Sequence, residues 1–186
     1  VWVLIQPLFA GLIFAAIFGR YAGLPSEGVP YLLFVLTGLV GWSLVSGTVQ
    51  RAAPGVVAES RLITKVYFPR MLIPGAAAVS AFVDFLIGLV VLCAVSALWG
   101  GFSFFRFPWV FAGAFLLGIA GLGVGLVLAS LGVRFRDFVH AAPFVLQIWL
   151  YSSPVVFSAS IIPPGIKWVL YLNPATAALE LLRHGL

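Results

Sequence analysis

Residues that could carry out chemistry are few in this sequence, and they do not form a recognisable catalytic set. Neither lysine follows a glycine, because Lys65 comes after a threonine and Lys167 after an isoleucine. The Gly-Lys pair of a phosphate-binding loop is therefore absent. The two histidines, His140 and His184, lie far apart, and we assign neither to a metal site. We expect a chain that is not an enzyme and has no metal or cofactor of its own.

One acid stands out because of its surroundings. Asp84 lies near the middle of an apolar stretch at residues 72–99. A carboxylate at bilayer depth costs on the order of 2.5–3.5 kcal/mol on insertion scales, so such an acid is retained for a reason. No basic residue is expected in the middle of a span to pair with it. Two roles stay open, namely a hydrogen-bonded acid that holds helices together and a group that takes part in gating or substrate contact.

The composition defines the setting in which these residues act. Hydrophobic residues make up 63% of the 186 residues and charged residues 8%, whereas soluble domains carry roughly 45–50% apolar and about 25% charged residues. Such a chain cannot cover its surface with polar groups, which excludes a water-soluble monomer. Stretches without Asp, Glu, Lys or Arg lie at residues 1–19, 28–50, 85–105, 107–133 and 138–166. Each is about as long as, or longer than, the roughly 20 residues that a helix needs to cross a bilayer. The sequence predicts an all-α, polytopic membrane protein.

Six membrane-spanning helices are expected to position the polar residues. Their approximate ranges are 2–19, 29–49, 72–99, 108–133, 138–153 and 175–186. The sequence begins inside the apolar run of the first range and stops inside the helical pattern of the last range. We therefore expect one transmembrane domain over residues 1–186, truncated at both ends.

The region after the fifth expected span is broken by prolines. Pro154 interrupts the apolar run, and a second turn follows at residues 163–165. The two short apolar pieces between the turns, 155–162 and 166–172, are too short to span. Such pieces are tolerated at membrane depth only where they face protein or water. We expect two re-entrant extracytoplasmic helices here, and Asn173-Pro174 as the start of the last helix.

Small residues recur at four-residue spacing in the fourth expected span. Gly121, Gly125 and Ala129 lie on one helix face. Such a stripe lets a neighbouring helix approach closely. We expect it to be a helix-packing surface.

The distribution of Lys and Arg predicts the orientation. The stretches 50–70 and 134–137 carry six of these residues, whereas the alternate loops carry three, which are Arg20, Arg106 and Lys167. The positive-inside rule puts the six-charge set, and with it the N-terminus, in the cytoplasm. The net charge of +5 lies between spans rather than on one face, so we expect no nucleic-acid partner.

The longest polar stretch, residues 50–70, contains a candidate docking element. Pro54 suits the first turn of a short helix over residues 56–66, which would display Glu59, Arg61 and Lys65. Such a helix could bind anionic lipid as an amphipathic surface helix. It could equally dock a soluble partner.

Aromatic residues and a proline in or beside the first and fifth spans are candidates for a channel or gate. An aromatic face stacks on sugar rings and tolerates a ligand that slides past it. For each residue, lipid contact or core packing remains the alternative. These candidates are Phe14, Phe18, Trp149, Tyr151, Pro154 and Phe157.

Several runs of the sequence resemble one protein family in order along almost the whole chain. The most specific is ESRLITKVYFPR at residues 59–70, and further runs lie at 6–8, 18–20, 23–26, 28–31, 133–137, 146–156 and 172–174. They resemble the permease subunit of type-2 ABC transporters. The branch is the one that exports O-antigen, capsular polysaccharide and teichoic acid from bacteria.

The resemblance implies a multi-pass homodimer in the bacterial cytoplasmic (inner) membrane, bound to two copies of a separate ATPase that holds ATP and Mg²⁺. It implies a polysaccharide substrate carried on a polyprenyl-diphosphate lipid. The segments 155–162 and 166–172 would match short extracytoplasmic gate helices. The segment that couples to the ATPase would contain Glu59, Ser60, Arg61, Lys65, Tyr67, Phe68, Pro69 and Arg70.

Two alternatives remain at this point. A type-2 permease for a drug or a simple lipid would share the same fold. A membrane transferase that uses polyprenyl lipids would need several acids or histidines near one interface, where only Asp137 and His140 come close.

Overall fold

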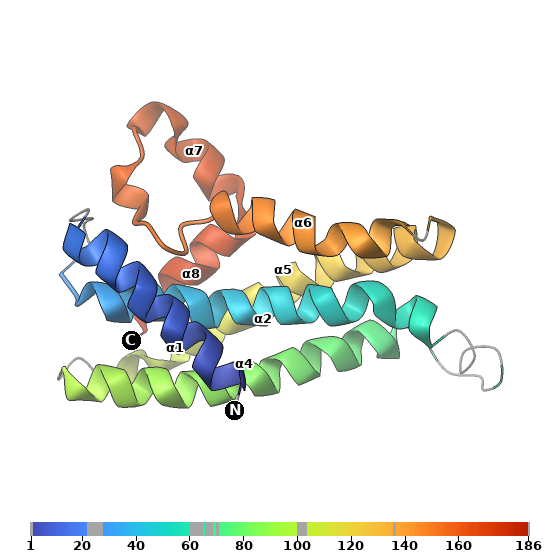
Figure 1. Ribbon diagram of the computed structural model, residues 1–186, viewed down its shortest axis with the longest axis horizontal. Coiled ribbons are helices and arrows are strands. Elements are labelled where there is room, and N and C mark those ends of the chain that lie inside the picture. The colour runs from blue at the N-terminus through green and yellow to red at the C-terminus, as the bar shows by residue number, and fades with distance from the viewer. Residues whose placement is uncertain are drawn as a thin grey trace.

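The computed structural model describes residues 2–21, 28–59, 65, 69, 71–99, 104–135 and 137–185, and within these ranges the regular structure is helical (Figure 1). The all-α prediction is therefore confirmed for the described part of the chain. Two 3-10 turns lie at Phe104–Arg106 and Ala159–Ile161. The longer elements are α1 (Trp2–Phe14) with its π-helical continuation (Ala15–Tyr21), α2 (Tyr31–Ala58), α4 (Leu72–Leu98), α5 (Phe107–Arg134), α6 (Asp137–Tyr151), α7 (Pro164–Leu172) and α8 (Pro174–His184).

Three of these helices are long and apolar enough to cross a bilayer. They are α2, α4 and α5, with 28, 27 and 28 residues, or roughly 40 Å each at 1.5 Å per residue. These three helices confirm the prediction, made from composition, of a multi-pass membrane protein. The count of six spans remains a prediction, since α6 has 15 residues and α8 has 11.

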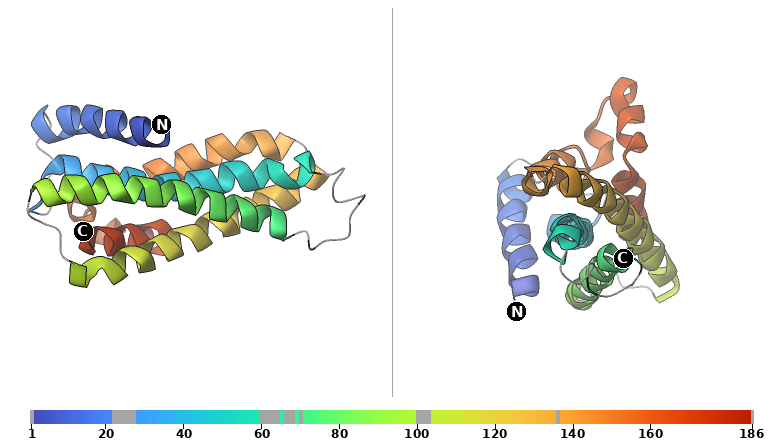
Figure 2. Two further views of the ribbon diagram at one scale, coloured as in Figure 1. Left: turned by 90° about the horizontal axis from the view of Figure 1, so that it is seen from below. Right: turned by 90° about the vertical axis from the view of Figure 1, so that its right-hand side faces the viewer.

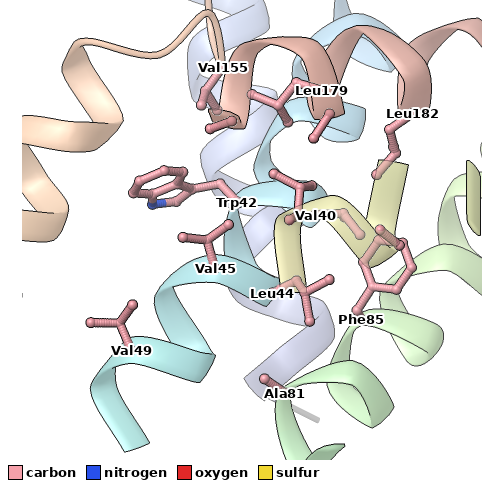
Figure 3. Packing of buried hydrophobic residues seen from close by; sticks show 14 of the residues in the cluster. Val40, Trp42, Leu44, Val45, Val49, Ala81, Phe85, Val155, Leu179 and Leu182 are labelled. Atoms are coloured by element: carbon pink, nitrogen blue, oxygen red, sulfur yellow. The ribbon is translucent and has the colours of Figure 1, made fainter. Parts of the chain in front are cut away.

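Helix α2 lies at the centre of the bundle. Its most extensive contacts are with α5 and α4, and it also contacts α1, α6 and α8. Seen along the bundle, the other helices surround it (Figure 2). Leu44, Val45 and Val49 are almost fully buried and belong to one continuous core that includes Phe85 of α4 and Leu179 of α8 (Figure 3).

The small-residue stripe of α5 is a packing surface, as predicted. A Cβ atom at Gly121 would lie 3.2 Å from the Cα and carbonyl oxygen of Val45, and one at Gly125 would lie 2.9 Å from Cβ of Ala52. The first distance is tighter than most real Cβ contacts, and the second is shorter than real Cβ atoms show. The glycines therefore allow α5 to contact the backbone of α2 directly.

The close contact with α5 extends α2 beyond its expected end. The prediction of a loop from residue 50, with a new helix starting near Pro54, is wrong: α2 continues through Pro54 to Ala58. Proline removes one helical hydrogen bond, but Ala52 and Ala53 are fully buried. Packing of this last part of α2 outweighs the local preference of the proline.

The predicted half-helix at residues 155–162 is also wrong, because only the 3-10 turn Ala159–Ile161 forms there. Two consecutive carbonyl groups explain the difference. The oxygen of Val155 accepts a hydrogen bond from Nη2 of Arg183 at 2.8 Å, and the oxygen of Val156 accepts one from the hydroxyl of Tyr31 at 2.8 Å. Side chains of α8 and α2 thus bind carbonyls that a helix would otherwise use.

Helix α8 begins at Pro174 with Asn173 as its N-cap, as predicted, but runs in an unexpected direction. A Cβ atom at Gly113 of α5 would contact Ala178, whereas Gly185 lies against Val110. Helix α8 is therefore antiparallel to α5 and ends near the start of α5. This direction is opposite to that of the predicted sixth span over residues 175–186.

The contact between α5 and α8 can be tested with two alanine substitutions on the same helix. A Cβ atom at Gly113 would lie 2.6 Å from the carbonyl oxygen of Ala178 and 2.9 Å from the backbone nitrogen of Leu182, whereas Gly118 has open space. We expect Gly113→Ala to destabilise the fold by about 1–3 kcal/mol, because α8 must shift. Gly118→Ala, the matched control, should have no cost. Thermal unfolding in detergent measures both, and equal midpoints would contradict the close contact.

Candidate functional site

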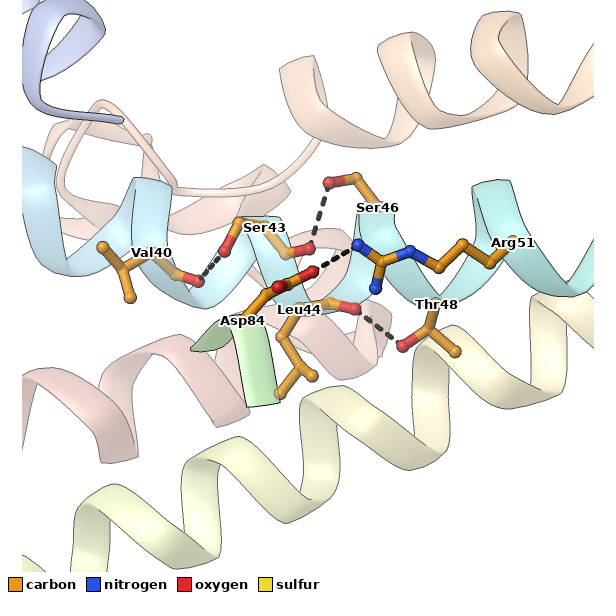
Figure 4. Close-up of polar contacts among 7 residues, drawn as sticks. All are labelled: Val40, Ser43, Leu44, Ser46, Thr48, Arg51 and Asp84. Atoms are coloured by element: carbon orange, nitrogen blue, oxygen red, sulfur yellow. Dashed lines mark hydrogen bonds and ion pairs between the residues drawn. The ribbon is translucent and has the colours of Figure 1, made fainter. Parts of the chain in front are cut away.

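An ion pair joins the last third of α2 to the middle of α4. Nη2 of Arg51 on α2 donates a hydrogen bond to Oδ2 of Asp84 on α4 (Figure 4). Asp84 lies near the middle of the 27-residue α4. The expectation that Asp84 has no basic partner is therefore wrong, because Arg51 belongs to the extended α2 rather than to a loop.

Small residues make room for this ion pair. Gly47 lies one turn before Arg51, and a Cβ atom there would lie 3.7 Å from Nη1 of Arg51 and 3.4 Å from Cβ of Ala81. Ala81 is buried on α4, one turn before Asp84. The two helices therefore approach closely at Gly47 and Ala81, and the guanidinium group extends along α2 to the carboxylate.

The ion pair is only partly covered. The side chain of Arg51 is 42% exposed and that of Asp84 is 28% exposed. Because the pair lies near the middle of a membrane-spanning helix, lipid would be its neighbour if this face met the bilayer. Charged groups at that depth face protein or water instead of hydrocarbon. We therefore expect the exposed side of the pair to face protein or water and not lipid.

Other polar side chains extend this face along α2. Ser43, Ser46 and Gln50 recur at three- and four-residue spacing, which places them on one side of the helix. The hydroxyl of Ser43 donates to the carbonyl oxygen of Val40 at 2.7 Å, and that of Ser46 to the carbonyl oxygen of Ser43 at 3.3 Å (Figure 4). We call Ser43, Ser46, Gln50, Arg51 and Asp84 the polar face.

Helix α1 covers the neighbouring part of α2 but stops short of the polar face. Pro7 and Leu8 of α1 lie against Leu36 and Val40 of α2. Figures 1 and 2 show α1 along the half of α2 that begins at Tyr31, with its N-terminal end near the middle of the bundle. Among the described residues, the part of α2 from Ser43 onward is thus left open on this side.

A second polar cluster joins α6 to the start of α8. The indole nitrogen of Trp149 donates to Oδ1 of Asn173 at 2.8 Å, and Nδ2 of Asn173 donates to the hydroxyl of Ser153 at 2.8 Å. Oδ1 of Asn173 also caps α8 by accepting from the backbone nitrogen of Ala175. The ring of Trp149 packs edge-on against Trp42, with centroids 5.6 Å apart. This junction orients α8 relative to α2 and α6.

The candidate channel residues do not come together at one place in the monomer. Phe14 and Phe18 stack on each other along the α1 segment, with centroids 5.8 Å apart. Trp149 belongs to the junction with Asn173, whereas Tyr151 is 70% exposed. Pro154 is buried and Phe157 is partly buried in the turn after α6. Their role in a channel stays a prediction.

Glu59, the first of the candidate coupling residues, lies at the opposite end of α2 from Tyr31. Glu59 follows the last turn of α2, where its backbone nitrogen donates to the carbonyl oxygen of Gly55 at 2.9 Å. Glu59, Lys65 and Pro69 are exposed. The remaining members, Ser60, Arg61, Tyr67, Phe68 and Arg70, lie outside the described residues.

Two charged residues on α8 were not singled out from the sequence, and both face a cavity near the start of α2. Arg183 places its guanidinium carbon 3.6 Å from the centroid of the Phe34 ring, in addition to its bond to Val155. Glu180 lies one turn earlier on the same helix. The sequence feature that could have identified them is the spacing of three residues between Glu180 and Arg183 in an otherwise apolar segment. Within the described ranges, no group of three or more His, Cys, Asp or Glu residues could hold a metal ion.

Comparison with known proteins agrees with this helical, partly polar bundle. Residues 1–186 match the ABC-2 type transporter family, and the chain belongs to that family. The predicted resemblance to type-2 ABC permeases is thereby confirmed. The chain is 23% identical over 192 residues to the O-antigen export system permease protein RfbA of Klebsiella pneumoniae, covering 99% of this chain and 72% of that protein. It is 24% identical over 181 residues to RfbA of Myxococcus xanthus, covering 96% and 68%.

The ion pair can be tested by a double-mutant cycle. Asp84→Asn leaves the charge of Arg51 without its partner at membrane depth, so we expect a loss of about 1–3 kcal/mol in stability. Adding Arg51→Gln removes that charge and should recover most of the loss. Thermal unfolding of the four proteins in detergent measures the coupling. Additive losses in the double variant would contradict a direct interaction.

Proposed function

We propose that this chain is the permease subunit of an ATP-driven exporter that moves a lipid-linked polysaccharide across the bacterial cytoplasmic membrane. The family match over the whole chain supports a transport function. Relatives named O-antigen export system permease protein in two organisms support a polysaccharide substrate over a drug. A membrane transferase is not favoured, because the match to transporters leaves no part of the chain for it.

The observation that carries the proposal is the half-exposed polar face. Hydrocarbon cannot solvate Arg51 and Asp84 at this depth, whereas a water-filled path can. The pair carries no net charge, and the serine hydroxyls already bond within their own helix. Such a surface offers weak polar contacts to a passing sugar chain without binding it tightly. This is the property that a translocation path requires.

The proposed assembly places two such faces opposite each other. In a homodimer, the polar faces of two copies would enclose the path that one copy leaves open. The excess of Lys and Arg at residues 50–70 and 134–137 favours a cytoplasmic position for that end and for the N-terminus. Helices α7 and α8 would then form a re-entrant pair on the extracytoplasmic side, joined at Asn173. The complete permease would have six spans, of which α8, as a re-entrant helix, would not be one.

The path can be tested by thiol accessibility in the complete transporter with Cys93 replaced by serine. Single cysteines at Ser43, Ser46 and Gln50 should react with a water-soluble thiol reagent, because they line the path. Cysteines at Val83 and Val90, which are 50% and 70% exposed on α4, should react at least tenfold more slowly if they face lipid. Comparable rates at all five positions would contradict the assignment of the path to the polar face.

Coupling to the ATPase can be tested by reversing two charges beyond α2. We expect the double variant Glu59→Arg with Arg61→Glu to insert normally but to copurify with less ATPase and to export less surface glycan. The reason is that a docking surface depends on where each charge lies, and this reversal keeps the total charge.

The matched control is Arg61→Gln with Lys65→Gln, which lowers the total positive charge. A lipid-binding helix would be sensitive to this control and not to the reversal. Unchanged copurification and export in the reversal variant would remove the segment from the coupling role.

A further inference from the structure

A cavity of about 650 Å³ opens at the end of the bundle where α2 and α5 begin. This volume lies within the range of small-molecule sites, roughly 300–1,000 Å³. Its polar and aromatic lining comes from four separate parts of the chain. The residues that bear on its chemistry are Phe34, Trp99, Arg106, Glu180, Arg183 and His184.

The helix ends around the cavity define its depth in the membrane. Gly28 and Pro30 precede α2, Trp99 follows the last turn of α4, and Arg106 precedes α5. All three long apolar helices therefore end at the cavity. Because such helices span the hydrocarbon core, their common end lies at the level of the lipid headgroups. Exposed Trp99 and Trp109 at this level match the aromatic belt of membrane interfaces.

The charges that line the cavity favour an anion. Among the described residues that line the cavity, Arg106 and Arg183 outnumber the acid Glu180. Arg183 is held in place over Phe34 and by its bond to the carbonyl oxygen of Val155. Arg106 is exposed and makes no hydrogen bond or ion pair to any residue in the described ranges. The cavity thus combines one guanidinium fixed by the protein with one that is available to a ligand.

We propose that this cavity binds the phosphate of a membrane phospholipid headgroup, with Arg106 as its principal contact. A guanidinium donates two parallel hydrogen bonds to phosphate oxygens, which suits Arg better than Lys for this role. The first part of the acyl chains would lie against Leu33, which also lines the cavity. Phosphate is the abundant anion at headgroup depth, and an exposed guanidinium at this depth can pair with it. This site is separate from the polar face and does not depend on the proposed transport function.

The test is native mass spectrometry of the complete transporter in detergent, titrated with phosphatidylglycerol. Arg106→Gln should weaken binding about tenfold or more, because the variant loses charge-assisted hydrogen bonds to the phosphate. Arg106→Lys should retain more binding than Arg106→Gln, and equal folding of both variants is checked by thermal unfolding. Arg20→Gln is the matched control, since Arg20 is also exposed, at the end of the α1 segment, and does not line the cavity.

The outcomes separate the sources of the ligand. Glucosyl diacylglycerol, which has no phosphate, should bind poorly, and equal binding of this lipid would overturn the proposal. An equal effect of Arg106→Gln and Arg20→Gln would also overturn it, because general surface charge would then explain the binding. Displacement of phosphatidylglycerol by polyprenyl phosphate at equal concentration from the unsubstituted protein, but not from Arg106→Gln, would overturn the assignment to a phospholipid and assign the phosphate site to the carrier lipid.

Discussion

Close packing of α5 against α2 determines where the polar residues of this chain lie. Gly121 and Gly125 let the two backbones meet, and the buried Ala52 continues that contact beyond the expected end of α2. Helix α2 therefore carries Arg51 within its length. Without this contact, Arg51 would belong to a loop and Asp84 would have no cation within reach.

A second set of contacts shapes the opposite end of the bundle. The chain after α6 does not form a helix because Arg183 donates to the carbonyl oxygen of Val155 and Tyr31 donates to that of Val156. Asn173 then caps α8 and directs it back along α5. Polar groups inside an apolar bundle are satisfied by such specific partners, because leaving them unpaired costs more than distorting a short helix.

The polar face and the cavity lie at different depths and differ in kind. The polar face around Arg51 and Asp84 is half open, lies near mid-bilayer and is electrically balanced. The cavity beside Arg106 lies at headgroup depth and carries an excess of positive charge. A balanced surface suits passage of a polar chain, whereas unbalanced charge suits retention of an anion. One small domain thus carries two polar surfaces with different chemistry.

The sequence by itself determined the membrane class, the three long helices, the α5 packing stripe and the N-cap at Asn173. These features depend on hydrophobic run length, small-residue spacing and local capping, which act over a few neighbouring residues. Only the tertiary structure decided the partner of Asp84, the passage of α2 through Pro54 and the direction of α8. Each depends on contacts between residues far apart in the chain, such as Arg51 with Asp84 and Gly113 with Ala178. Local preference cannot predict them, because packing energy in the assembled bundle outweighs it.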